Sequence, residues 1–281
     1  MMKNNALFAF FISFFCLSSA AFGWDLTFGG GVDYSSYSTK NKSYAGSDFK
    51  PDILPLYFTE FKDDFAIAYS YNIGLGFDTI WRNMFECGVS YSFGHINLGM
   101  GFFIGESDLT FNALDIGVSG RAGFKLEGLF FANAGLAASQ GSNSLAERKR
   151  YSVQAGFWLP HILITADFEM RTYTEELSGT LNLYAGRTLV RVKTEIFSKN
   201  VPYRLAFTAG WEDLSRRLEN GAVLEDVSFK QFFAGMHFFN QPGKTFAWFI
   251  EGEVPLNFDD FSDIKVFYRA AMGLIFSYPE H

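Results

Sequence analysis

The stretch from Asp263 to Tyr278 limits most strongly what this chain can fold into. Every even position from Ile264 to Tyr278 is apolar, whereas the odd positions include Lys265 and Arg269. This alternation is typical of a β-strand with one apolar face and one mixed face. Strands of soluble proteins usually end after about five or six residues, and crossing a bilayer at a tilt takes about 9–11. The stretch is therefore long enough to cross a membrane.

The same alternation recurs along the chain and predicts about fourteen strands. They are expected at 24–35, 53–61, 65–77, 85–93, 96–104, 114–126, 129–139, 151–159, 162–170, 180–197, 202–212, 227–239, 245–254 and 263–278. In 180–197 the apolar parity changes partway, which predicts a β-bulge near Gly186-Arg187. Segment 227–239 has apolar residues on both parities, so its facing stays open.

The connections between these segments alternate in length. The long ones are 36–51, 78–83, 106–113, 140–149, 174–178, 213–226 and 255–263; the short ones are 62–64, 94–95, 127–128, 160–161, 198–201 and 240–244. Outer-membrane barrels combine short periplasmic turns with longer external loops. The pattern predicts an all-β fold, a transmembrane antiparallel up-and-down β-barrel of about 14 strands, within a range of 12 to 16. Both chain ends are expected on the short-turn side. A soluble β-sandwich fits less well, because so many apolar faces exceed what one sandwich core can bury.

The end of the last segment resembles the C-terminal strand of bacterial outer-membrane barrels. That strand carries a glycine, an aromatic three residues on and a second aromatic two further, here Gly273, Phe276 and Tyr278. The chain departs from the pattern at Ala271, where a polar residue is usual, and in ending on Pro279-Glu280-His281. The resemblance implies a porin-like outer-membrane β-barrel of double-membraned bacteria. It also implies contact with outer-membrane lipid and recognition of this strand by the barrel assembly machinery.

The first 23 residues have the features of a signal peptide. Lys3 precedes an apolar run from Ala6 to Leu17, and Ala21-Phe22-Gly23 provides a small-residue cleavage site. The run is too short to span a bilayer. A lipoprotein with Cys16 as acceptor fits poorly because Phe15 is bulky. We therefore expect residues 1–23 to be removed on export to the cell outer membrane, and residues 24–281 to form the barrel.

Charge and side-chain chemistry exclude several functions. Removing Lys3 from the 23 Lys+Arg leaves 22 against 30 Asp+Glu, a formal charge of −8 that argues against nucleic acid as a partner. Only Cys87 then remains, so no intramolecular disulfide is possible. His95 and His161 fall in short turns, and no spacing typical of a metal site occurs. We expect no enzymatic activity, no metal and no cofactor.

The mixed faces of the strands are predicted to face the barrel lumen. The pore-lining candidates are Asp115, Arg121, Lys125, Asp167, Glu169, Arg171, Arg191, Lys193, Glu251, Glu253, Lys265 and Arg269. Asp25, Asp33, Glu86, Glu195, Glu212 and Arg204 are placed on the same inward faces. Charges of both signs set a field across a pore, although they could instead pair across strands and fill it. Glu251 and Glu253 are expected near Lys265 and Arg269, across loop 255–263.

These features predict a porin-like channel for passive diffusion of small hydrophilic solutes, ions included. One alternative is a closed barrel that acts as a surface adhesin or structural scaffold and binds an external ligand through loops 36–51 and 213–226. A second is a transporter of hydrophobic small molecules. It fits less well, because in that family a plug comes first and here no plug segment is expected before Trp24.

Overall fold

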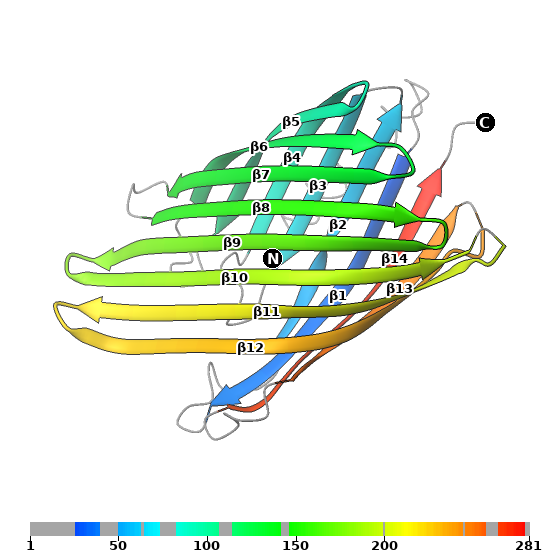
Figure 1. Ribbon diagram of the computed structural model, residues 1–281. Helices are drawn as coiled ribbons and strands as arrows, with labels where there is room; N and C mark the ends of the chain where they lie inside the picture. The colour runs from blue at the N-terminus through cyan, green and yellow to red at the C-terminus, as the bar shows by residue number, and fades with distance from the viewer. Residues whose placement is uncertain are drawn as a thin grey trace, which may run out of the picture.

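The computed structural model describes residues 26–39, 50–62, 65–73, 83–106, 114–141, 146–198, 200–243, 245–256 and 264–278. In these ranges fourteen antiparallel strands form a closed barrel in which sequence neighbours pair (Figure 1). The strands are β1 (Leu26–Thr39), β2 (Lys50–Lys62), β3 (Phe65–Ile73), β4 (Asn83–Phe93), β5 (Ile96–Glu106), β6 (Leu114–Leu126), β7 (Phe130–Gly141), β8 (Ala146–Leu159), β9 (Ile162–Ser178), β10 (Leu181–Phe197), β11 (Tyr203–Asn220), β12 (Val223–Asn240), β13 (Phe246–Pro255) and β14 (Ile264–Tyr278). The predicted up-and-down barrel is confirmed. The predicted leader, residues 1–23, lies outside the described ranges.

The first and last strands close the barrel. β1 pairs with β14 in continuous register from Leu26 opposite Tyr278 to Tyr37 opposite Phe267. The start of β1 and the end of β14 therefore lie at the same end of the barrel, which we call the turn end. The opposite end, where β1 ends and β14 begins, is called the loop end.

Two loop-end connections differ from the prediction. β9 and β10 are joined by Gly179-Thr180, and β11 and β12 by Gly221-Ala222. Gly179 and Gly221 have positive φ angles of 48° and 66°, which suit a tight hairpin turn. The predicted long loops at 174–178 and 213–226 are therefore wrong. The hairpins β9–β10 and β11–β12 project further toward the left of Figure 1 than β6 to β8 do.

The register shows a bulge between β1 and β2 that was not predicted, and none at the predicted position in β10. Gly29 faces Tyr57 and Gly31 faces Leu54, so Gly30 lies opposite both Pro55 and Leu56. Proline lacks the N–H of a sheet hydrogen bond, which explains the irregularity. β10, in contrast, pairs with both neighbours without interruption through Gly186-Arg187. The parity change in this strand arises because Leu183 and Leu189 face inward and are buried.

The outer face of the barrel is apolar around its middle. Large side chains such as Met100 (72% exposed) and Val118 (65% exposed) point away from the barrel. On β9 the outward positions are apolar from Ile162 to Met170, a stretch of nine residues that matches the length needed to cross a bilayer. We call this outward surface the apolar belt. Within the described part of the chain, no helix has the length and apolarity needed to span a bilayer.

Polar side chains replace the apolar belt toward the loop end. On β11 and β12 the outward positions change from Trp211 and Phe232 to Asp213 and Lys230, whose Oδ2 and Nζ atoms lie 3.6 Å apart. On β8, Lys149 Nζ lies 2.8 Å from Glu147 Oε1, and the hydrogen bond to Glu147 raises the pKa of Lys149. The ends of β9 to β12 therefore extend beyond the apolar belt as a polar sheet.

The inner face is packed by aromatic rings that lie over glycines of neighbouring strands. A Cβ atom added at Gly117 would lie 2.1 Å from the ring of Phe103, and one at Gly156 would lie 2.1 Å from Phe131. Each glycine belongs to the strand next to its aromatic partner. The small residues on the inner face therefore leave room for side chains that lie flat against the wall.

Replacing Gly210 by alanine tests this packing. The new Cβ would lie 2.4 Å from the Phe233 ring and 2.4 Å from the carbonyl oxygen of Val190, which belongs to the backbone and cannot move aside easily. We expect the free energy of unfolding to fall by about 1–3 kcal/mol. Gly120→Ala is the matched control, because its Cβ meets no atom within 4 Å. Equal stabilities of the two variants in denaturant titrations would contradict this account.

Candidate functional site

The inner wall carries the predicted charged residues on the strand faces opposite the apolar belt. Among the pore-lining candidates, the described side chains are those of Arg121, Lys125, Asp167, Glu169, Arg171, Arg191, Lys193, Glu251 and Glu253, and all occupy inward positions. The side chains of Asp115, Lys265 and Arg269 fall outside the described part of the structure. The lumen is therefore the candidate site.

Five polar residues form a connected chain around the middle of this wall. Asn133 Nδ2 on β7 donates to Gln154 Oε1 on β8 at 3.4 Å, and Gln154 Nε2 donates to Asp167 Oδ1 on β9 at 2.6 Å. Arg191 Nε on β10 lies 4.0 Å from Asp167 Oδ2, and Arg191 Nη1 lies 3.5 Å from Glu253 Oε1 on β13. We call this chain the polar girdle.

The Arg191–Glu253 pair crosses two intervening strands. Arg191 lies opposite Gly210 on β11, and Glu253 lies opposite Gly235 on β12. A Cβ atom at Gly235 would lie 2.7 Å from Glu253 Cγ. Glycines on the two middle strands therefore leave the space in which the arginine and the glutamate reach each other.

Three arginines lie side by side above the polar girdle, toward the loop end. Arg171 on β9 lies directly opposite Arg150 on β8 and Arg187 on β10. Like charges at facing positions of a sheet repel each other. Acidic neighbours offset this repulsion: Arg171 Nε lies 2.6 Å from Glu169 Oε1, and Arg187 Nη2 lies 2.6 Å from Glu212 Oε1.

Glu212 is the most completely enclosed carboxylate of the described inner wall. It is 1% exposed. Its Oε1 accepts hydrogen bonds from Arg187, and its Oε2 accepts one from Gln231 Nε2 at 3.1 Å. A buried carboxylate is stable when both oxygens have such partners. Arg187, Glu212 and Gln231 therefore link β10, β11 and β12 on the inner side.

A second buried group lies at the same end of the barrel. Arg148 is fully buried, with its guanidinium carbon 5.0 Å from the centre of the Tyr173 ring. The Tyr173 hydroxyl donates a hydrogen bond to Glu175 Oε2. Tyr173 belongs to an apolar cluster with Phe103, Ala137 and Leu183. These three side chains, Arg148, Tyr173 and Glu175, together cover the inner face of the polar sheet.

The alternation pattern does not predict Arg148, Arg187, Glu175 or Gln231 as site residues. The sequence predicts loops at 140–149 and 174–178, whereas β8 begins at Ala146 and β9 ends at Ser178. The pattern also does not decide the facing of β12. The dipeptide Asn220-Gly221 is a strong hairpin signal and could have shown that β11 and β12 continue beyond the apolar belt.

The register of β13 and β14 shows which positions of the expected group of acids and bases face each other. Glu253 lies opposite Arg269 in the register, but Glu251 lies opposite Ala271. Glu251 Oε2 instead lies 3.4 Å from His237 Nδ1 on β12. No base lies directly across from Glu251, because the register of the two strands places Ala271 there.

Histidines and acids are dispersed over the described residues. His95 and His161 lie in turn-end turns. No group of three or more His, Cys, Asp or Glu side chains that could hold a metal ion occurs within the described ranges. The described inner wall therefore presents positively and negatively charged side chains in fixed positions.

Comparisons with known proteins show the fold. No protein-family model matches the chain, and no curated protein matches its sequence. A bacterial polysaccharide outer membrane secretin superposes with a TM-score of 0.51 at 9% identity, over 91% of this chain and 98% of that one. An outer membrane channel from Pseudomonas putida F1 gives 0.49 at 10% identity, over 90% and 96%. A loop L8 deletion mutant of the Vibrio cholerae outer membrane protein OmpT gives 0.47 at 9%, over 90% and 99%. The secretin comparison confirms the predicted β-barrel fold.

Proposed function

We propose that this protein is a porin-like channel of the bacterial outer membrane through which small hydrophilic solutes diffuse passively. The observation that carries the proposal is the contrast between the two faces of the wall. The outer face is an apolar belt, and the inner face carries the polar girdle and the paired charges above and below it. Such a distribution suits a barrel with lipid outside and water inside.

The charge pairs give the proposed pore a selective wall. Arg191 stands between Asp167 and Glu253 in the polar girdle, so positive and negative groups alternate along the wall. Rings of charged side chains act on permeating ions through their local field. The channel should therefore conduct ions of both signs, with a preference that depends on the balance of these charges.

Export and assembly belong to the same proposal. Residues 1–23 would direct export, and Gly273, Phe276 and Tyr278 would be read by the assembly machinery. On β14, Gly273 faces inward and Phe276 packs against Phe246, with ring centres 5.3 Å apart. We propose no enzymatic role for the barrel.

Single-channel recording tests the proposal. We expect the refolded protein to conduct and the double variant Glu251→Gln/Glu253→Gln to shift the ion preference toward anions, because two negative charges leave the wall. The control Glu147→Gln/Glu176→Gln removes the same charge from outward positions at the loop end and should leave the preference unchanged. A conducting double variant with the wild-type reversal potential would show that these two glutamates do not set selectivity.

The second candidate is a barrel with a closed lumen that acts as a surface scaffold or adhesin. The buried positions of Arg148, Glu212 and Gln231 favour it, because side chains are tightly enclosed on part of the inner wall. In this candidate the projecting hairpins β9–β10 and β11–β12 would provide the external binding surface. A protein that is folded by heat-modifiable gel mobility and gives no conductance would favour this candidate over the channel.

A further inference from the structure

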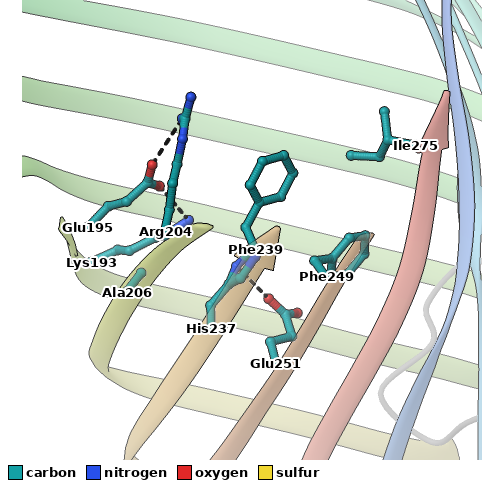
Figure 2. Close-up of a pocket in the computed structure, with 9 residues that line it drawn as sticks. All are labelled: Lys193, Glu195, Arg204, Ala206, His237, Phe239, Phe249, Glu251 and Ile275. Carbon is teal, nitrogen blue, oxygen red and sulfur yellow. Dashed lines mark hydrogen bonds and ion pairs between the residues drawn. The ribbon is translucent and has the colours of Figure 1, made fainter. Parts of the chain in front are cut away.

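A recess in the inner wall near the turn end carries an inference beyond passive diffusion. It has a volume of about 380 Å³ and is formed by side chains from β10 to β14 (Figure 2). Its lining residues are Lys193, Glu195, Arg204, Ala206, His237, Phe239, Phe249, Glu251 and Ile275. A volume of this size lies within the range of small-molecule sites.

One side of the recess holds more positive than negative charge. Lys193 Nζ lies 3.4 Å from Glu195 Oε2, and Arg204 Nη1 lies 3.1 Å from Glu195 Oε1. Two cations thus share a single carboxylate, and the three residues together keep one positive charge. The Arg204 side chain is 52% exposed, so its other N–H groups can reach a molecule in the lumen.

The rest of the recess is largely apolar. Phe239, Phe249 and Ile275 line the side of the recess away from Lys193 and Glu195, as Figure 2 shows. The guanidinium carbon of Arg204 lies 5.6 Å from the centre of the Phe239 ring, so charge and aromatic surface adjoin. An anion with an apolar body would place its charged group against the cations and its apolar body against the aromatic surface.

Glu251 and His237 limit which other ligands the recess could bind. They lie beside Phe249, and the His237 and Phe249 ring centres are 5.6 Å apart. The Glu251 carboxylate disfavours a second negative group at this side of the recess. The recess therefore suits one anionic group better than two.

We propose that the recess binds small monocarboxylates with an aromatic or apolar body. The carboxylate would contact Arg204 and Lys193, and the body would lie on Phe239, Phe249 and Ile275. The proposal rests on the proposed function in that binding here matters to the cell only if solutes pass through the lumen. Binding at the recess would make the turn end of the pore selective for such solutes.

Calorimetric titration of the refolded protein with benzoate tests the proposal directly. Benzamide has the same shape without the charge, and acetate has the charge without the ring. We expect benzoate to bind about tenfold or more tightly than either, because a hydrogen-bonded charge and a buried ring each contribute on this scale. Equal affinity for benzoate and benzamide, or for benzoate and acetate, would overturn the proposal.

Variants locate the binding. Arg204→Met should weaken benzoate binding about tenfold or more, and Arg204→Lys should restore most of it by returning the charge. Phe249→Ala should weaken benzoate more than acetate. Lys125→Met is the matched control, because Lys125 faces inward near the turn end on β6 and lies outside the recess. Unchanged binding in folded Arg204→Met protein, or an equal loss in Lys125→Met, would refute the site.

Bilayer recordings separate this proposal from the channel function. A barrel that conducts but does not bind benzoate leaves the channel in place and removes the subsite. A folded barrel that binds benzoate in the predicted way but does not conduct keeps the subsite and removes the channel. If both hold, benzoate should interrupt the ion current of the wild type and not of Arg204→Met.

Discussion

Replacing Arg187 by methionine is expected to lower the free energy of unfolding by about 3–5 kcal/mol, as measured by denaturant titration of the refolded barrel. The Arg187 side chain is 10% exposed and the Glu212 side chain 2%, and their charged atoms lie 2.6 Å apart. Removing the arginine leaves Glu212 enclosed with Gln231 and without its closest cation. A buried charge that loses its partner is far more costly than the pair itself.

Two further variants separate this effect from general disturbance. Arg187→Met/Glu212→Gln should recover much of the loss, because a neutral amide at position 212 can still accept from Gln231. Arg217→Met, an outward position on β11 that is 49% exposed and paired with Glu219, should cost at most about 1 kcal/mol. A loss at Arg217 as large as that at Arg187 would show that burial of the pair is not the cause.

Placing arginine on the apolar belt should destabilise the barrel by about 2–4 kcal/mol when the site lies near mid-membrane. Ala134 on β7 points outward between Ala132 and Leu136, so we expect this cost for Ala134→Arg. Asn133→Arg, one residue earlier on the same strand, points into the lumen and should cost little. Reversible unfolding in lipid vesicles measures both. Equal costs would mean that the inward and outward assignment is incorrect.

The sequence alone determined the number of strands and most of their bounds. Each of the fourteen alternating segments is a strand, and 114–126 coincides with β6. The alternation of apolar and polar residues reflects the two faces of a strand at each residue. It can therefore be read without knowing which strands are neighbours in the barrel. The facing of the charged residues on β6, β9 and β13 followed from the same signal.

Alternation failed where both faces of a strand are apolar. Leu183 and Leu189 are buried inside while Val190 and Val192 face outward, so β10 carries apolar residues on both parities without a bulge at Gly186-Arg187. The inward side of β10 meets Phe103 and Tyr173 from other strands, and those contacts cannot be read from β10 itself. The polarity of a residue shows which medium it suits, and not which side chain will cover it.

Only the tertiary structure decided which charges meet. Arg191 and Glu253 are 62 positions apart in the chain and three strands apart in the barrel, and they reach each other over Gly210 and Gly235. Lys193 and Arg204 share Glu195 because the register of β10 and β11 brings them to one place. Strand pattern is a local property of the chain, whereas the partners of a lumen charge depend on the register and on the closure of the whole barrel.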